Sequence, residues 1–93
     1  DYPAVPNSIL ISGEFNFSNG TIRTFNIEPC DKYSIYIHVQ KGKAAMYPGN
    51  STVCITINEG DSYKASLDWN YAPYLKITGT EDGTVAEINA TRE

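Results

Sequence analysis

Alternation of apolar and polar residues is the feature that most restricts how this chain can fold. It is clearest in the segments YSIYIHV, residues 33–39, and YKASLDW, residues 63–69. Successive side chains of a β-strand point to opposite faces, so these segments predict strands with one buried face. No segment carries apolar residues at the spacing of three and four that marks an amphipathic helix. The chain is therefore predicted to be all-β.

Turn residues separate the alternating segments at intervals of about 8 to 12 residues. They include Pro48-Gly49, residues 58–61 and residues 81–83, and Gly, Pro, Asn and Asp favour tight turns. About seven or eight short strands predict a small antiparallel β-sandwich of the Greek-key or jelly-roll type. No repeat, linker or low-complexity tract divides the chain, so residues 1–93 are expected to form a single domain.

Asn19-Gly20 predicts a hairpin turn, because both central residues of a type I′ turn need positive φ. A two-residue loop would send Phe25 and Ile27 to the face opposite Phe15 and Phe17. A longer or bulged loop sets Phe15 opposite Phe25 and brings all four side chains together. We expect the longer loop, since burying each large apolar side chain contributes roughly 1.5 to 3 kcal/mol.

Cys30 and Cys54 form an even pair in a small acidic chain, which predicts a disulfide. Closing a loop of about 25 residues would contribute roughly 3 to 3.5 kcal/mol, a large share of the stability of a small domain. The alternative is a pair of buried free thiols, as in a cytosolic protein.

Glycan acceptor sequons indicate the compartment. Four sequons are present, a mild excess over chance, with candidate acceptors Asn16, Asn19, Asn50 and Asn89. Together with the cysteine pair they predict a secreted or cell-surface protein, although a bacterial source would leave these asparagines unmodified. The chain begins with Asp1 instead of Met, which predicts a processed or excised segment. No apolar run approaches the roughly 18 residues of a membrane span, so we expect no membrane insertion.

Charge and motifs argue against several classes of function. A net charge of −4 with scattered Lys and Arg disfavours nucleic acid, whose backbone needs a positive surface. The single histidine, His38, lies in an alternating segment, and GxSxG, CxxC and phosphate-loop motifs are missing. The acidic turns at 58–61 and 81–83 offer oxygen ligands for calcium but match no EF-hand loop. We therefore expect no catalysis, no cofactor and no metal site.

Aromatic residues are the remaining candidates for binding. The chain has seven Tyr and one Trp, and the segment DWNYAPY spans residues 68–74. Aromatic rings beside carboxylate and amide oxygens suit sugar stacking, and Tyr and Trp also anchor protein interfaces. The predicted ligand-binding residues are Asp68, Trp69, Asn70, Tyr71 and Tyr74. The alternative for Trp69 is a place in the core, since it continues the apolar face of residues 63–67.

Two stretches, Ile11-Ser-Gly13 with the aromatic alternation after it and residues 74–79, resemble secreted bacterial jelly-roll modules appended to peptidases. The size, the cysteine pair and the strand density are similar to those of small β-sandwich effectors secreted by plant-pathogenic fungi. Neither pattern contains a diagnostic motif, so no site residue is assigned from it.

The predicted function is that of a secreted, non-catalytic recognition module. It would bind a protein or a glycan through the loop aromatics or through an edge strand. The alternative is a small secreted effector or virulence protein of a pathogen that acts through protein–protein contacts.

Overall fold

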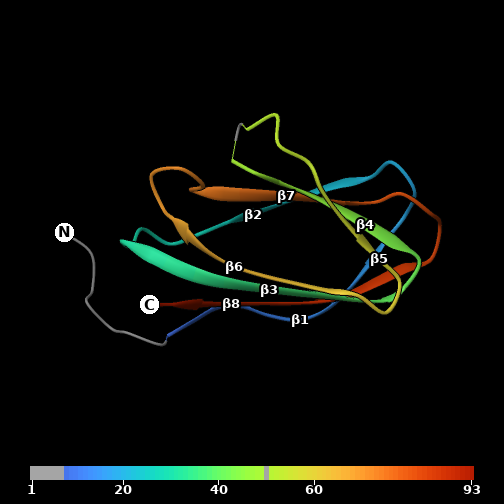
Figure 1. The fold of residues 1–93 in the computed structure, drawn as a ribbon, viewed down its shortest axis with the longest axis horizontal. Coiled ribbons are helices and arrows are strands. Elements are labelled where there is room, and N and C mark those ends of the chain that lie inside the picture. The colour runs from blue at the N-terminus through green and yellow to red at the C-terminus, as the bar shows by residue number, and fades with distance from the viewer. Residues whose placement is uncertain (1–7, 50) are drawn as a thin grey trace.

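The computed structural model describes residues 8–49 and 51–93, and all regular structure within them is β-strand. The strands are β1 (Ile9–Phe17), β2 (Ile22–Asn26), β3 (Lys32–Lys41), β4 (Lys43–Pro48), β5 (Ile55–Asn58), β6 (Ser62–Asp68), β7 (Tyr74–Gly79) and β8 (Thr84–Arg92). They form two antiparallel four-stranded sheets that pack together, as in a β-sandwich (Figure 1). This confirms the all-β, antiparallel prediction. Among the described residues, no helix is long and apolar enough to cross a bilayer.

Strand pairing follows a nested order. Sheet A has the order β1-β8-β3-β6, and sheet B has the order β2-β7-β4-β5. The first strand pairs with the last, β2 with β7, β3 with β6, and β4 with β5. These nested pairs alternate between the two sheets, so the chain is wound like one long antiparallel ribbon folded over on itself.

The core lies between the sheets and follows the alternation. In β3 every second residue from Tyr33 to Val39 is fully buried, and the residues between them lie half-buried on the outer face of sheet A. The inner strand β8 repeats this pattern with Ala86, Ile88 and Ala90. From sheet B, Met46, Leu75 and Ile77 are fully buried against them.

The predicted hairpin between the aromatic segments is wrong, because β1 belongs to sheet A and β2 to sheet B. Phe15 and Phe25 do meet, with ring centroids 5.1 Å apart, but they do so across the two sheets. Phe17 and Ile27 lie in the same core cluster. Packing two sheets face to face therefore brings these four side chains to the core, with Phe17 and Ile27 buried and Phe15 and Phe25 half-buried.

The Asn19-Gly20 segment is nevertheless a tight turn. The Thr21 N–H donates to the Ser18 carbonyl at 3.1 Å, and Gly20 has a φ of +82°. Both central residues are exposed. The turn carries the chain from one sheet to the other, with the Gly20 N–H donating to the Gly79 carbonyl at 3.1 Å.

We expect Gly20→Val to destabilise the fold by about 1 kcal/mol or more, because a β-branched residue at positive φ is strained. Beyond its chain neighbours, no atom lies within 4 Å of a Cβ built at this position, so backbone strain is the expected cause of the loss. Gly20→Asn is the control, since Asn tolerates this conformation. Thermal unfolding of both variants measures the effect, and an unchanged melting temperature in Gly20→Val would contradict it.

The predicted Cys30–Cys54 disulfide is also wrong, since both thiols are free. Cys30 is buried in the loop that enters β3 of sheet A, where burial raises the pKa of its thiol and the nearby Arg92 partly offsets that rise. Cys54 is exposed just before β5 of sheet B, beside the hydroxyl of Tyr47. The nested pairing carries the two cysteines to different sheets, beyond the reach of a disulfide.

Candidate functional site

An open cleft of about 650 Å³ lies at the end of the molecule where β3 begins and β6 ends. Pairing of these strands sets Lys32 opposite Asp68. The pairing continues one step further, because the Trp69 N–H donates to the Asp31 carbonyl at 3.1 Å. The lining residues are Cys30, Asp31, Lys32, Asp68, Trp69, Asn70 and Tyr71.

Trp69 forms a fixed wall of the cleft. Its Nε1 donates to the carbonyl of Ile27 at 2.9 Å, which holds the indole ring in one orientation. The side chain is half-buried and packs against the core. Trp69 therefore lines the cleft with one part of its surface and packs against the core with another.

Tyr71 is the exposed aromatic ring of the cleft, with half of its surface open to solvent. Its hydroxyl lies 3.3 Å from Oγ of Ser51, which ties it to the loop between β4 and β5. Its backbone belongs to a compact turn, in which the Asp68 carbonyl accepts from the N–H groups of Tyr71 and Ala72. A ring held in this way can stack against a ligand with little loss of conformational entropy.

Two hydrogen bonds from buried residues hold the 68–71 turn and the segment after it against the core. The hydroxyl of Tyr33, a fully buried residue, donates to the Ala72 carbonyl at 2.6 Å. Gly49 donates its N–H to the Tyr74 carbonyl at 2.8 Å and has a φ of +57°. A Cβ at Gly49 would lie 2.7 Å from the Tyr71 carbonyl oxygen, so only glycine allows this close approach. The cleft wall is therefore built on a rigid base.

The structure brings together four of the five predicted ligand-binding residues, namely Asp68, Trp69, Asn70 and Tyr71. Tyr74 does not line the cleft. It lies on the outer face of sheet B, where the Lys76 ammonium is 5.6 Å from its ring centroid.

Sequence reasoning missed the opposite wall of the cleft, which consists of Cys30, Asp31 and Lys32. Nothing local in the sequence marks these residues, because only the β3–β6 pairing places them beside the 68–71 turn. Two carboxylates, Asp31 and Asp68, and one ammonium, Lys32, leave the lining with a net negative charge.

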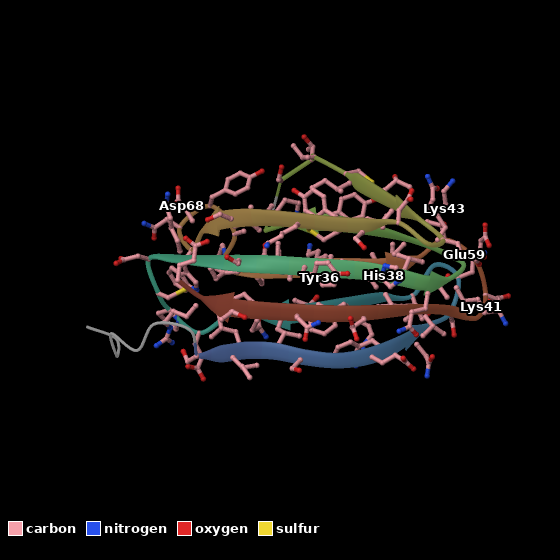
Figure 2. The ribbon with its side chains drawn as sticks, turned by 60° about the horizontal axis from the view of Figure 1, so that its bottom comes forward. Tyr36, His38, Lys41, Lys43, Glu59 and Asp68 are labelled. Carbon is pink, nitrogen blue, oxygen red and sulfur yellow. The ribbon has the colours of Figure 1, made fainter. Side chains whose placement is uncertain are left out.

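A second polar cluster lies on the outer face of sheet A (Figure 2). His38 Nδ1 lies 2.8 Å from Ser62 Oγ, and the Tyr36 hydroxyl lies 3.2 Å from the same oxygen. Glu87 of β8 is the register neighbour of His38 on the other side. A serine, a histidine and a carboxylate thus occupy adjacent strands, but they lie on the flat face of a sheet. We assign this row to cross-strand stabilisation of the sheet.

The candidate glycan acceptors that the structure describes all face outward. Asn16 and Asn19 are exposed, and Asn89 is half-buried on the outer face of sheet A. Asn50 lies outside the described residues. Within residues 8–49 and 51–93, no three His, Cys, Asp or Glu side chains are grouped so as to hold a metal ion.

Comparisons with known protein families, curated proteins and solved structures found no match for this chain. The chemistry of the cleft is therefore the basis for a functional proposal.

Proposed function

We propose that this protein is a secreted, non-catalytic recognition module that binds a glycan in the cleft between the start of β3 and the 68–71 turn. The observation that carries the proposal is the convergence of a fixed indole and a half-exposed phenol with carboxylate and amide groups in one open cleft. Sugar rings stack on aromatic faces through their C–H groups, while their hydroxyls need oxygen acceptors nearby.

The architecture that we propose for this module is an eight-stranded jelly roll. The nested strand pairs, which alternate between two sheets, support this topology. In such a double sheet the loops gather at the two ends, and the cleft lies at one of these ends. Binding residues on loops held by a rigid scaffold are a common arrangement in β-proteins.

The charge of the cleft favours particular sugars. Asp31, Asp68 and Asn70 provide acceptors for hydroxyl groups, and Lys32 provides a donor. Because the lining has a net negative charge, neutral sugars and amino sugars fit better than sulfated or uronic acid sugars. The ligand class that we propose is therefore a neutral or amino sugar.

Secretion remains a proposal that depends on the sequons. The outward placement of Asn16, Asn19 and Asn89 supports it, because a chain glycosylated at these positions could still fold. The cysteines no longer contribute to this argument, since they do not pair.

The proposal predicts that Tyr71→Ala lowers the affinity for the bound glycan about 10-fold or more, as expected for an aromatic anchor. A glycan array first identifies the ligand, and calorimetric titration then compares the variants. The matched control is Tyr74→Ala, which removes a neighbouring tyrosine outside the cleft and should leave the affinity unchanged.

Two results would contradict this proposal. One is equal affinity in Tyr71→Ala and the unmodified protein. The other is a blank array combined with capture of a specific protein partner, which would favour the alternative of an effector acting by protein–protein contact.

A further inference from the structure

The edges of the two sheets differ in how well they resist pairing with another strand. Within the described residues, β5 has four residues and β2 has five. Arg23 of β2 also points inward, with its guanidinium 5.0 to 5.8 Å from three Phe ring centroids. Edge β1 has a register shift between Ile9 and Ile11, and Gly13 has a φ of +150°. Short edges, inward charges and bulges all disfavour edge-to-edge pairing.

Edge β6 has none of these features. It pairs with β3 in unbroken register from Ser62 to Asp68, and it contains neither Gly nor Pro. In Figure 2 it forms the gold border of sheet A, with the green β3 on its inner side. This edge is therefore the most regular in the described part of the chain.

The direction of the free backbone groups of β6 follows from the bonds at its two ends. The Val39 N–H donates to the Asp61 carbonyl, and the Trp69 N–H donates to the Asp31 carbonyl, both at 3.1 Å. Bonded and non-bonded pairs alternate along an antiparallel ladder. The odd-numbered residues of β6 thus bond to β3, and the N–H groups of Lys64, Ser66 and Asp68 point to the open edge.

The inner face of this edge is incompletely covered. Tyr63, Leu67 and Trp69 are half-buried, whereas the inward residues of the neighbouring β3 are fully buried. The edge strand of sheet B, β5, has four residues, whereas β6 has seven. An added strand would cover these side chains.

We propose that β6 pairs antiparallel with β6 of a second copy of this chain, in a register centred on Ser66, to form a symmetric dimer. A two-fold axis through Ser66 sets Lys64 directly opposite Asp68 of the second copy, and Asp68 opposite its Lys64. Opposite charges that face each other across two strands stabilise the pairing. This charge complementarity selects a second copy as the occupant of the edge.

The same register pairs backbone groups at the centre of β6 and matches the residues of the inner face. The Ser66 N–H reaches the Ser66 carbonyl of the second copy, and the Asp68 N–H reaches the carbonyl of its Lys64. The Asp68 carbonyl takes no part in this pairing, because it accepts from the N–H groups of Tyr71 and Ala72 in its own chain. On the inner face, Ala65 lies opposite Leu67 of the second copy, so a small residue meets a large one. Tyr63 lies opposite Trp69 of the second copy, an aromatic pair of the kind that stabilises sheets. An isologous interface requires this self-complementarity.

The proposal also extends the cleft. Asp68 is one of its lining residues, so the pairing brings the Lys64 ammonium of the second copy to its rim. Dimer formation does not depend on the glycan proposal, because it is measured without any ligand.

Sedimentation velocity over a concentration series up to about 1 mM, the weak end of specific association, tests the dimer. The average mass of the unmodified chain should rise toward twice that of one chain. Lys64→Asp and Asp68→Lys should each remain monomeric, because like charges then face each other across the interface. An equimolar mixture of the two variants should recover the dimer, since each carboxylate of one variant would then face an ammonium of the other.

A monomeric unmodified protein at the highest concentration would overturn the proposal, and so would a dimer that both single variants retain. Failure of the mixture to dimerise, when both variants are folded by circular dichroism, would reject the register centred on Ser66. A dimer that forms in the mixture but in neither variant by itself supports the proposal. Two variants that merely misfold cannot restore each other.

Discussion

We expect Gly42→Ala to destabilise the fold by about 2 to 5 kcal/mol, through backbone strain and overpacking together. Gly42 has a φ of +82°, in the region that L-residues avoid. A Cβ at this position would lie 2.4 Å from Oγ1 of Thr84 and 3.0 Å from its Cα. The backbone of Thr84 is part of β8, so it cannot move away without disturbing the sheet.

Thr84 is also confined from its other side. It is fully buried, and its Oγ1 donates to the Glu81 carbonyl at 2.7 Å. A Cβ at Gly79 would lie 3.0 Å from Cβ of Thr84 and 2.8 Å from that of Phe17. Thr84 therefore fills the space between two glycines, and an added methyl group has no room.

Gly60→Ala is the matched control for this prediction. Gly60 has nearly the same φ, +84°, but no atom lies within 4 Å of a Cβ built on it. Its substitution should cost only the backbone strain, about 1 to 2 kcal/mol. Urea unfolding of both variants measures the difference. Equal losses in the two variants would show that Thr84 does not pack tightly against Gly42.

The second large effect is expected at Tyr33, the buried residue beneath the cleft. Tyr33→Ala should cost about 3 to 5 kcal/mol, as for other large aromatic side chains removed from a core. Tyr33→Phe should cost about 1 to 3 kcal/mol, because it leaves the buried Ala72 carbonyl without the hydroxyl that bonds to it at 2.6 Å. Tyr33→Phe should also loosen the 68–71 turn and weaken ligand binding.

Tyr36→Phe provides the comparison on the same strand. Its hydroxyl contacts Ser62 on the outer face of sheet A, where water can replace the lost bond. The expected loss is within about 0.5 kcal/mol. If chemical denaturation gives equal losses for the two Tyr→Phe variants, the buried hydrogen bond of Tyr33 does not support the turn.

Burial raises the pKa of Tyr33 above its usual value, so the folded state favours the protonated hydroxyl. The stability that this group contributes is complete below a pH of about 10 and is lost as the pH rises toward the folded pKa. We expect the Tyr33→Phe variant to lack the part of the stability loss at alkaline pH that the Tyr33 hydroxyl causes.

Local features of this fold follow from the sequence alone. The direction of each side chain in β3 and β6 follows from the two-residue period of a strand, so Tyr33 and Leu67 could be assigned to the inner face before any pairing was known. The turns at Gly20, Gly60 and Gly83 were predictable for a similar reason. Positive φ is a property of a single residue, and all three glycines have it.

Strand partners depend on how the two sheets pack. The apolar faces of β1 and β2 can be buried by a hairpin or by two sheets packed face to face, and local sequence does not distinguish these solutions. The pairing of β1 with β8 closes the whole chain on itself, which no local pattern specifies. The disulfide prediction failed for the same reason, since Cys30 and Cys54 are close in sequence but enter different sheets.

The cleft depends both on local sequence and on the packing of the sheets. Residues 68–71 lie on a single turn, so their aromatic and polar side chains were recognisable as a group from the sequence. Asp31 and Lys32 join them only because β3 pairs with β6. Tyr74 leaves the group because β7 turns its side chain to the outer face of sheet B. The residues of a turn are neighbours in the sequence, so they can be predicted as a group. The two walls of a cleft come from distant segments, which only the pairing of strands in the packed sheets brings together.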